Sequence, residues 1–184
     1  MQHFVIVTGL PASGKTTVAV GVARALGWPH FDKDEFLEQL FDEEGVGDLH
    51  WRRGLSKRAD LLLQHSALGV AHAVLSSWWC HPKSVGDSGT ATGWLDNDAQ
   101  IEVIELHCVC GAATASNRFL ARKRHPGHLD ERWSREQLAK SFMEQAALGP
   151  LFHKRVIELD TEVSVSPRAI QALADQVLRH TAGA

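Results

Sequence analysis

One run near the start of the chain has the residue types and spacing needed to hold phosphate. Gly9-Leu-Pro-Ala-Ser-Gly-Lys-Thr16 fits the pattern G-x-x-x-x-G-K-[ST]. Glycines at this spacing let the backbone curl around an anion, so that successive N–H groups and the start of the following helix point at the phosphate oxygens. In such loops the lysine reaches the β- and γ-phosphates, and the hydroxyl after it binds Mg²⁺. The run therefore predicts a site for a nucleoside triphosphate and Mg²⁺, and the alternative is an anion-binding turn without a nucleotide function. The predicted nucleotide-binding residues of the run are Gly9, Pro11, Ala12, Ser13, Gly14, Lys15, Thr16 and Thr17.

A second polar group stands in Phe31-Asp-Lys-Asp-Glu-Phe36, where Asp32 and Asp34 are two residues apart. A phosphoryl acceptor needs a carboxylate that orients its hydroxyl and takes its proton, and Mg²⁺ needs oxygen ligands. The two aspartates can supply both roles. The alternative is that either one only caps the helix that follows.

The strands and helices that must position these residues alternate along the chain. Apolar strand-like runs alternate with amphipathic helical runs, which predicts an α/β protein with a largely parallel sheet. Ligands of such sheets bind beyond the carboxyl ends of the strands. Ser134 with Gln137 fits a capping box, and Ser166 before Pro167 fits a helix start. The expected strands are 3–8, 28–32, 72–78, 101–108 and 154–160, and the expected helices are 15–26, 34–42, 52–68, 112–123, 134–148 and 167–180.

Composition limits the class of protein. The chain has 184 residues, of which 44% are hydrophobic, enough for one domain over residues 1–184. Its net charge of −3 gives no general attraction for a polyanion, so nucleic acid is not expected as a partner. No apolar run approaches the ~18 residues of a membrane span, and no charged leader precedes the first strand. We therefore expect a cytoplasmic protein; the composition leaves its oligomeric state open.

The chain has three cysteines, Cys80, Cys108 and Cys110. An odd number in such a protein argues against a disulfide framework. Cys108 and Cys110 fall on one face of the fourth strand and, with His81 or His107, could bind zinc. The alternative is that they are small buried apolar residues.

The phosphate-binding run and the aspartate pair together carry a family resemblance. Gly9-Leu-Pro-Ala-Ser-Gly-Lys-Thr-Thr17 and Asp32-Lys-Asp34 resemble small P-loop kinases of the group that contains zeta toxins, chloramphenicol phosphotransferase and the polynucleotide 5′-kinase domain. The resemblance is specific over the first 36 residues or so, and elsewhere it rests on the order of elements. It implies a P-loop NTPase fold with a five-stranded, mostly parallel sheet flanked by helices. It also implies transfer of the γ-phosphate of ATP to a hydroxyl, with Asp34 at the position of the catalytic base.

The same resemblance implies an arginine-bearing helical lid, for which residues 118–133 are the candidate. Arg118, Arg122 and Arg124 come at the end of a predicted helix, before a Pro-Gly break. Arg118 and Arg122 are four apart, so on a helix they share a face and can converge on one phosphate chain; Lys15 and these two arginines are the candidates for stabilising the transferred group. Arg118 and Arg124 are the lid's candidates for nucleotide contact. The alternative is a solvated basic helix end that the helix dipole favours.

One departure from the wider P-loop pattern concerns the metal. The third strand runs into Ser76-Ser-Trp-Trp79 without the aspartate that holds Mg²⁺ through water in many NTPases. Motor and switch ATPases are therefore less expected. Asp32 can take over this task beside Thr16, or Ser76 and Ser77 can contact the waters of the metal.

The acceptor site is less well marked. Tryptophans in or beside predicted loops, with His81 and Arg52-Arg53, can form the walls of a pocket for a ring-containing substrate, although tryptophan is also a common core residue. These tryptophans are Trp51, Trp78, Trp79 and Trp94. The segment 88–93 offers hydroxyls to a polar ligand or is a plain surface connection.

The leading interpretation is a kinase that phosphorylates a hydroxyl of a small molecule such as an antibiotic, a nucleoside or a sugar. One alternative is a polynucleotide 5′-hydroxyl kinase, which needs a basic channel. The other is a nucleotide-binding regulatory ATPase without an acceptor. By analogy with similar kinases, the adenine is expected near residues 161–163 and the lid.

Overall fold

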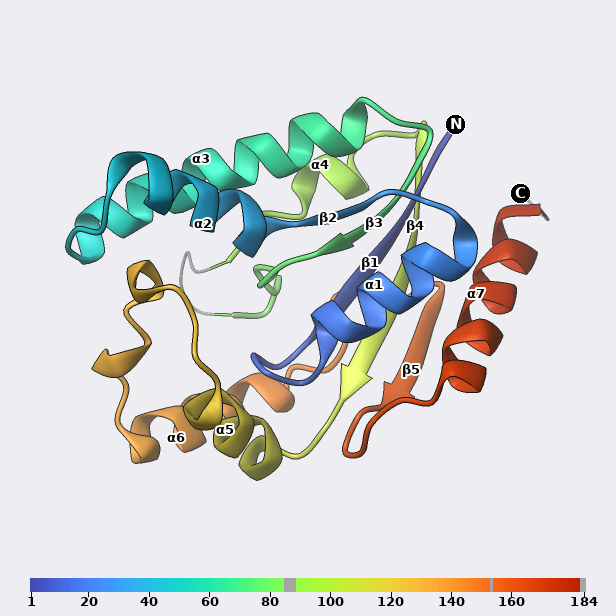
Figure 1. Cartoon of the computed structure of the whole chain (residues 1–184). Helices are drawn as coiled ribbons and strands as arrows, with labels where there is room; N and C mark the ends of the chain where they lie inside the picture. The colour runs from blue at the N-terminus through green and yellow to red at the C-terminus, as the bar shows by residue number, and fades with distance from the viewer. Residues whose placement is uncertain (85–88, 153, 183–184) are drawn as a thin grey trace.

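A five-stranded sheet with the strand order β2-β3-β1-β4-β5 forms the centre of the computed structural model, which describes residues 1–84, 89–152 and 154–182 (Figure 1). Every pair of neighbouring strands is parallel. The strands are β1 (Gln2–Gly9), β2 (His30–Asp32), β3 (His72–Ser76), β4 (Ile101–Val109) and β5 (Val156–Asp160). The α-helices are α1 (Lys15–Leu26), α2 (Lys33–Glu44), α3 (Leu49–Leu68), α4 (Gly93–Asp96), α5 (Ala112–Ala121), α6 (Arg135–Ala146) and α7 (Pro167–Ala182), and the short 3₁₀ helices are η1 (Pro126–His128) and η2 (Asp130–Arg132).

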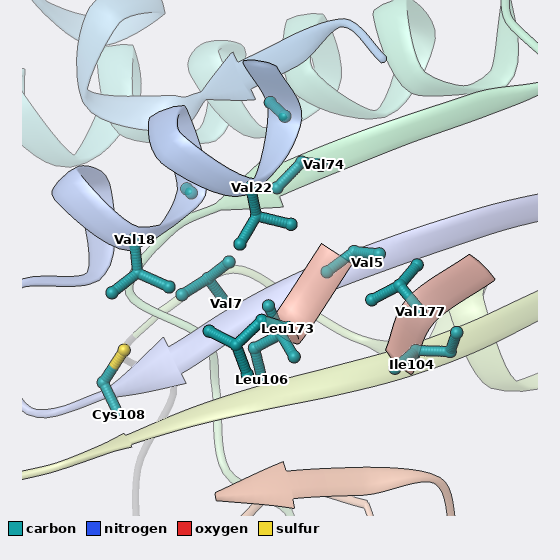
Figure 2. Packing of buried hydrophobic residues seen from close by; sticks show 12 residues of the cluster. Val5, Val7, Val18, Val22, Val74, Ile104, Leu106, Cys108, Leu173 and Val177 are labelled. Carbon is teal, nitrogen blue, oxygen red and sulfur yellow. The ribbon is translucent and has the colours of Figure 1, made fainter. Parts of the chain in front are cut away.

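Helices cover both faces of the sheet. The middle of β1 is buried residue after residue, as expected of a parallel strand that is covered on both sides. Helices α1 and α7 pack on one face, where Val7, Val18 and Leu106 belong to one apolar cluster (Figure 2). Helices α3 and α4 cover the other face. The cluster there consists of Phe4, Ile6, Leu63, Ala67, Ala73, Leu75, Trp79, Leu95 and Ile101.

The predicted α/β class and parallel sheet are confirmed, while several element ends differ. β3 ends at Ser76 instead of residue 78, because the chain then turns away and Trp79 forms only an isolated bridge with Thr90. α5 ends at Ala121, two residues earlier than expected, because the backbone of Arg122 is extended. The short helices α4, η1 and η2 were not expected. Hydrophobic periodicity does not reveal elements this short.

Both predicted helix starts are confirmed. Ser134 and Gln137 form a reciprocal capping box at α6. The Ser166 hydroxyl accepts the amide of Ala169 at 3.2 Å and so caps α7. No helix in the described part of the chain combines the length and the apolar character that a membrane span requires.

A buried carboxylate ties β4 to the connection that precedes β5. The side chain of Glu105 is fully buried. It accepts the Thr8 hydroxyl at 2.6 Å and the amides of Leu151 and Phe152 at 2.9 and 2.8 Å. Burial alone would raise the pKa of Glu105, but hydrogen bonds from His107, Thr8 and the two amides bring that pKa below its usual value. The carboxylate is therefore ionised and fully used within the fold.

Replacing Glu105 with alanine is expected to lower the free energy of unfolding by about 3–5 kcal/mol, because the buried network loses its charged acceptor. Two backbone amides and the Thr8 hydroxyl would then lack their partner. Chemical denaturation followed by circular dichroism measures the change. Glu102→Ala on the same strand is the control, since its exposed pair with Arg155 should contribute at most about 1 kcal/mol. Equal losses in the two variants would contradict the assignment of Glu105.

Candidate active site

The phosphate-binding loop joins β1 to α1, and its backbone requires glycine at two points. A Cβ atom at Gly9, where φ is +127°, would lie 2.3 Å from the Cys108 carbonyl oxygen. Gly14 precedes α1 with φ +96°, and no side chain of the described residues caps this helix start. The first N–H groups of α1 thus face the mouth of the loop. This arrangement suits an anion.

Lys15 folds back over this loop. Its Nζ donates to the carbonyl oxygens of Gly9 and Leu10 at 3.1 and 2.7 Å. The ammonium also lies 5.9 Å from the ring centroid of Trp78. Burial lowers the pKa of Lys15 to about 8, and the nearby carboxylates of Asp34 and Asp32 offset only part of that effect. Phosphate oxygens that replace the two carbonyls would favour the charged ammonium.

Asp32 is both a helix cap and a neighbour of the predicted metal residue. Its Oδ1 accepts the amide of Asp34 at 2.9 Å, which caps α2. Its Oδ2 accepts the hydroxyl of Thr16 at 3.1 Å. A hydroxyl and a carboxylate oxygen side by side are the donors that Mg²⁺ prefers, so this pair fits the metal.

The two serines considered for the metal have other partners. Ser76 Oγ lies 2.9 Å from His30 Nε2, and Ser77 Oγ is hydrogen-bonded to Thr90 Oγ1. Among these candidates and within the described residues, the contact with Thr16 belongs to Asp32. The structure therefore favours Asp32 over the serines as the replacement for the missing aspartate.

Asp34 lies at the start of α2 and forms an ion pair with Arg124 of the lid. About half of its side chain, 51%, is exposed to the cleft. Burial would raise the pKa of Asp34, but the positive charges of Arg124, His128 and Lys15 lower it below its usual value. Asp34 is therefore an ionised carboxylate at neutral pH, as a proton acceptor must be.

The lid arginines line one cleft, but each has its own partner within the protein. Arg118 donates to the carbonyl oxygens of Thr161 and Glu162 at 2.9 and 2.8 Å, next to the expected adenine position. Arg122 caps the end of α5, and its amide still donates to the Arg118 carbonyl at 3.1 Å, so the two residues lie one helical turn apart. The Arg122 guanidinium stacks 4.3 Å from the ring centroid of Phe119. Burial lowers the pKa of Arg122 to about 10, and the charge of Arg124 adds to this effect.

One cleft of ≈ 1360 Å³ lies between the phosphate-binding loop, α2, α3 and the lid. The site residues that line it are Gly14, Lys15, Thr16, Asp32, Asp34, Arg118, Arg122 and Arg124. The cleft is basic, in contrast to the net charge of −3 of the whole chain. Its basic lining residues are Lys15, Lys33, Arg52, Arg53, Lys57, Arg118, Arg122, Arg124 and Arg132. Its carboxylates are Asp32, Asp34, Asp60 and Asp130.

The predicted aromatic walls are only partly present. Trp78 and Trp94 line the cleft. Trp79 is instead buried, donates its Nε1 hydrogen to the Val7 carbonyl at 3.1 Å and lines a separate small pocket with His81, not this cleft. Trp51 is 41% exposed on α3 and is not among the lining residues. In the segment 88–93, residues 89–91 line the cleft, while residue 88 lies outside the described residues.

None of the three cysteines lines this cleft. All three are free thiols, and Cys108 and Cys110 line a separate small pocket of ≈ 120 Å³ together with His81 and His107. Within the part of the chain that the structure describes, no group of three metal-ligating side chains comes together. Burial raises the pKa of Cys108 to about 12. Cys108 is a small buried residue, whereas Cys80 and Cys110 are partly exposed.

A polar network in the floor of the cleft escaped the sequence analysis. The buried Lys33 ammonium lies 2.7 Å from Asp60 Oδ1, which also accepts the hydroxyl of Thr90 at 2.6 Å. Thr90 is in turn bonded to Ser77. The network connects α2, α3 and the loop after β3, three segments far apart in the sequence. The position of Lys33 between the two predicted aspartates was the only signal available.

The chain is similar to several known proteins, although no family model matches it. A protein of Xenopus tropicalis described as a "probable gluconokinase" is 26% identical over 133 residues, which cover 66% of this chain and 70% of that protein. A solved structure from Chloroflexus aurantiacus, described as a "putative kinase", is 26% identical, covers 97% of this chain and 98% of its own, and has a TM-score of 0.77.

A gluconokinase structure from Sinorhizobium meliloti is similar in fold, with a TM-score of 0.56 and 17% identity over 98% of this chain and 94% of its own. The two relatives at 26% identity are described as kinases, which supports a kinase but not specifically the group of zeta toxins and chloramphenicol phosphotransferase; the Sinorhizobium structure shows the fold alone. The resemblance to that particular group is therefore not supported. The broader assignment is supported, and the chain is a small P-loop kinase.

Proposed function

We propose that this small P-loop kinase transfers the γ-phosphate of ATP to a hydroxyl of a small acidic polyol of the sugar-acid type. The observation that carries the acidic acceptor is Arg52, whose guanidinium reaches the cleft from α3. No described carboxylate lies within ion-pair distance of Arg52 or Arg132, and Arg52 Nε is buried without a hydrogen-bond partner. An anionic group of the acceptor supplies the missing partner.

The electrostatics around Arg52 support this assignment. Burial lowers the pKa of Arg52, and the positive charge of Arg132 lowers it further, while Asp34 raises it. Two guanidinium groups that repel each other beside the candidate base favour an anion between them. Other cationic residues of the cleft, namely Lys15, Arg122 and Arg124, are suited to the phosphates of ATP. The similarity to a "probable gluconokinase" agrees with a sugar-type acceptor.

The chemistry then follows from the positions of the side chains. Asp34 accepts the proton of the acceptor hydroxyl as the hydroxyl oxygen attacks the γ-phosphorus, and ADP leaves with the bridging oxygen. Lys15, Arg122 and Arg124 stabilise the negative charge on the transferring phosphoryl group. Arg118 orients the nucleotide next to residues 161–163. Thr16 and Asp32 would hold Mg²⁺, which neutralises phosphate charge when bound.

The direct test is transfer of labelled γ-phosphate from ATP to a panel of hydroxyl compounds. The panel contains sugar acids, neutral sugars, nucleosides, an aminoglycoside and a 5′-hydroxyl oligonucleotide. We expect labelled product with sugar acids, and Asp34→Asn should lose it. Label on neutral compounds alone would overturn the acidic acceptor, and label on the oligonucleotide would favour a polynucleotide kinase. ADP formed at the same rate with and without every acceptor would favour a regulatory ATPase.

Replacing Arg52 with glutamine is expected to raise KM for the acceptor by about 10- to 100-fold, because a hydrogen bond between charged groups contributes about 1.5–3 kcal/mol. KM for ATP should remain near its original value, since Arg52 lies beside Asp34 and not at the phosphate-binding loop. Initial rates with each substrate varied in turn measure both constants. Arg58→Gln on the same helix is the control, because Arg58 pairs with Glu44 at the surface. A rise in KM for ATP instead would place Arg52 in the nucleotide site.

A further inference from the structure

Helix α2 carries a row of carboxylates on the side that faces the lid. Asp34, Glu38 and Asp42 follow one another at intervals of four residues, so they lie on one face of the helix. Residues 122–133 of the lid, which include the gold segment of Figure 1, lie against this face. This part of the lid is called the lid loop below.

Each of these carboxylates meets a basic side chain of the lid loop. His128 Nε2 lies 2.7 Å from Glu38 Oε1, and its side chain is fully buried. His125 Nε2 lies 3.3 Å from Asp42 Oδ1. With the ion pair between Arg124 and Asp34, these contacts attach the lid loop to the helix that bears the candidate base. Two of the three basic partners are histidines.

The surfaces between the charge pairs fit closely. A Cβ atom at Gly127 would lie 2.4 Å from the ring of Phe41, so only glycine allows this approach. The His125 ring stacks on Phe41 with ring centroids 5.2 Å apart, and the His128 ring meets it edge-on at 5.6 Å. The loop therefore docks in one defined position, and small changes in either histidine affect the whole contact.

Docking uses the His125 ring as a hydrogen-bonding group on both sides. Its Nδ1 accepts the amide of Gly127 at 3.1 Å, which begins the helix η1. Its Nε2 faces Asp42 Oδ1. The ring thus supports the turn that places Gly127 against Phe41.

Docking requires His128 in its neutral form. Its Nε2 donates to Glu38, while its Nδ1 is buried without a hydrogen-bond partner among the described residues. A proton on Nδ1 would create a buried charged donor without an acceptor. Burial lowers the pKa of His128, and the charge of Arg124 lowers it further, although Asp34 and Glu38 act in the opposite direction. The electrostatics thus agree with the geometry.

We infer that the lid loop is a pH-sensitive latch, which docks on α2 while His128 is neutral and is released when His128 takes up a proton. Release withdraws Arg124 from Asp34 and opens the cleft. An exposed histidine titrates near pH 6.5, so mild acidification favours the undocked loop. The role of the latch in catalysis rests on the proposed kinase function. The docking itself can be measured without any substrate.

The test is amide hydrogen exchange of peptides from the lid loop in the ligand-free protein, between about pH 7.5 and pH 5.5. Labelling times are scaled so that chemical exchange stays constant. We expect protection of residues 125–129 to fall about tenfold or more at the lower pH, because the undocked loop binds at least one additional proton. Peptides from β1 and β4 should keep their protection.

The decisive variant replaces both histidines of the lid loop and keeps their hydrogen bonds. In His125→Asn with His128→Gln, the asparagine oxygen can accept the amide of Gly127, and the glutamine amide can donate to Glu38. Its protection should be independent of pH, whereas the control His65→Gln on α3 should behave as the original protein. Protection that is equal at both pH values in the original protein would overturn the latch, as would an unchanged pH-dependent loss in the double variant. If the lid loop showed this pH dependence but no compound of the panel were phosphorylated, the kinase proposal would fail and the latch would stand.

Discussion

Replacing Asp34 with asparagine is expected to lower kcat for phosphoryl transfer by about 10²- to 10⁴-fold, the usual contribution of a general base. Asparagine has nearly the same shape and still accepts a hydrogen bond from Arg124, but it cannot take the proton of the acceptor hydroxyl. The Kd for ATP should therefore change by no more than about threefold. Steady-state rates and calorimetric titration with ATP measure the two effects.

The neighbouring substitution Glu35→Gln is the matched control for Asp34→Asn. Glu35 is exposed on the next position of α2 and does not line the cleft. It should leave kcat unchanged. If Asp34→Asn retained full turnover, Asp34 could not be the base. If it lost ATP binding as well, Asp34 would belong to the nucleotide site.

Replacing Lys15 with alanine is expected to lower kcat/KM for ATP by about 30-fold or more, which corresponds to at least ~2 kcal/mol of transition-state stabilisation. The loss reflects a charge-assisted contact to the β- and γ-phosphates. The exposed Lys140, which is 81% accessible on α6, supplies the control Lys140→Ala. Unchanged turnover in Lys15→Ala would refute the assignment of the phosphate-binding loop.

The pKa of Lys15 adds a signature that a merely structural lysine would lack. In the ligand-free loop its pKa is about 8, because burial disfavours the charged ammonium. Phosphate raises that pKa, so nucleotide binding takes up protons near pH 8, and ATP affinity falls as the pH rises through this value. Calorimetry in buffers of different ionisation enthalpy should detect the proton uptake, and Lys15→Ala should abolish it. Binding without proton uptake in the original protein would show that Lys15 does not meet the phosphates.

The fold was predictable because its signals are local. The glycines of the phosphate-binding loop, the alternation of apolar periods and the caps at Ser134 and Ser166 each act within a few residues. They located the parallel sheet, α1, α6 and α7. The nucleotide site follows from the same local signals, since Gly9 to Thr17 form one continuous segment. Periodicity over longer windows did not predict that β3 stops at Ser76.

The rest of the candidate site depends on contacts between distant segments. Nothing near Asp34 in the sequence indicates that Arg124 lies against it, and the pair of Lys33 with Asp60 joins two helices. Trp78 and Trp79 were both expected beside the acceptor, but successive side chains point to opposite sides of an extended chain, and Trp79 is buried. The unpaired Arg52 became informative only when the surrounding carboxylates had been located.

The contacts at the base of the lid determine how it can move. Arg118 holds the carbonyls of Thr161 and Glu162, and the Glu162 carboxylate in turn accepts the amide of Gly111 at 2.7 Å. Both ends of helix α5 are thereby held by residues 161–162, directly after β5. Any movement of the lid must therefore start beyond Ala121, where α5 ends, so that only the lid loop moves. A closure of the lid loop in the proposed reaction would then order only a dozen or so residues, which keeps its entropic cost small.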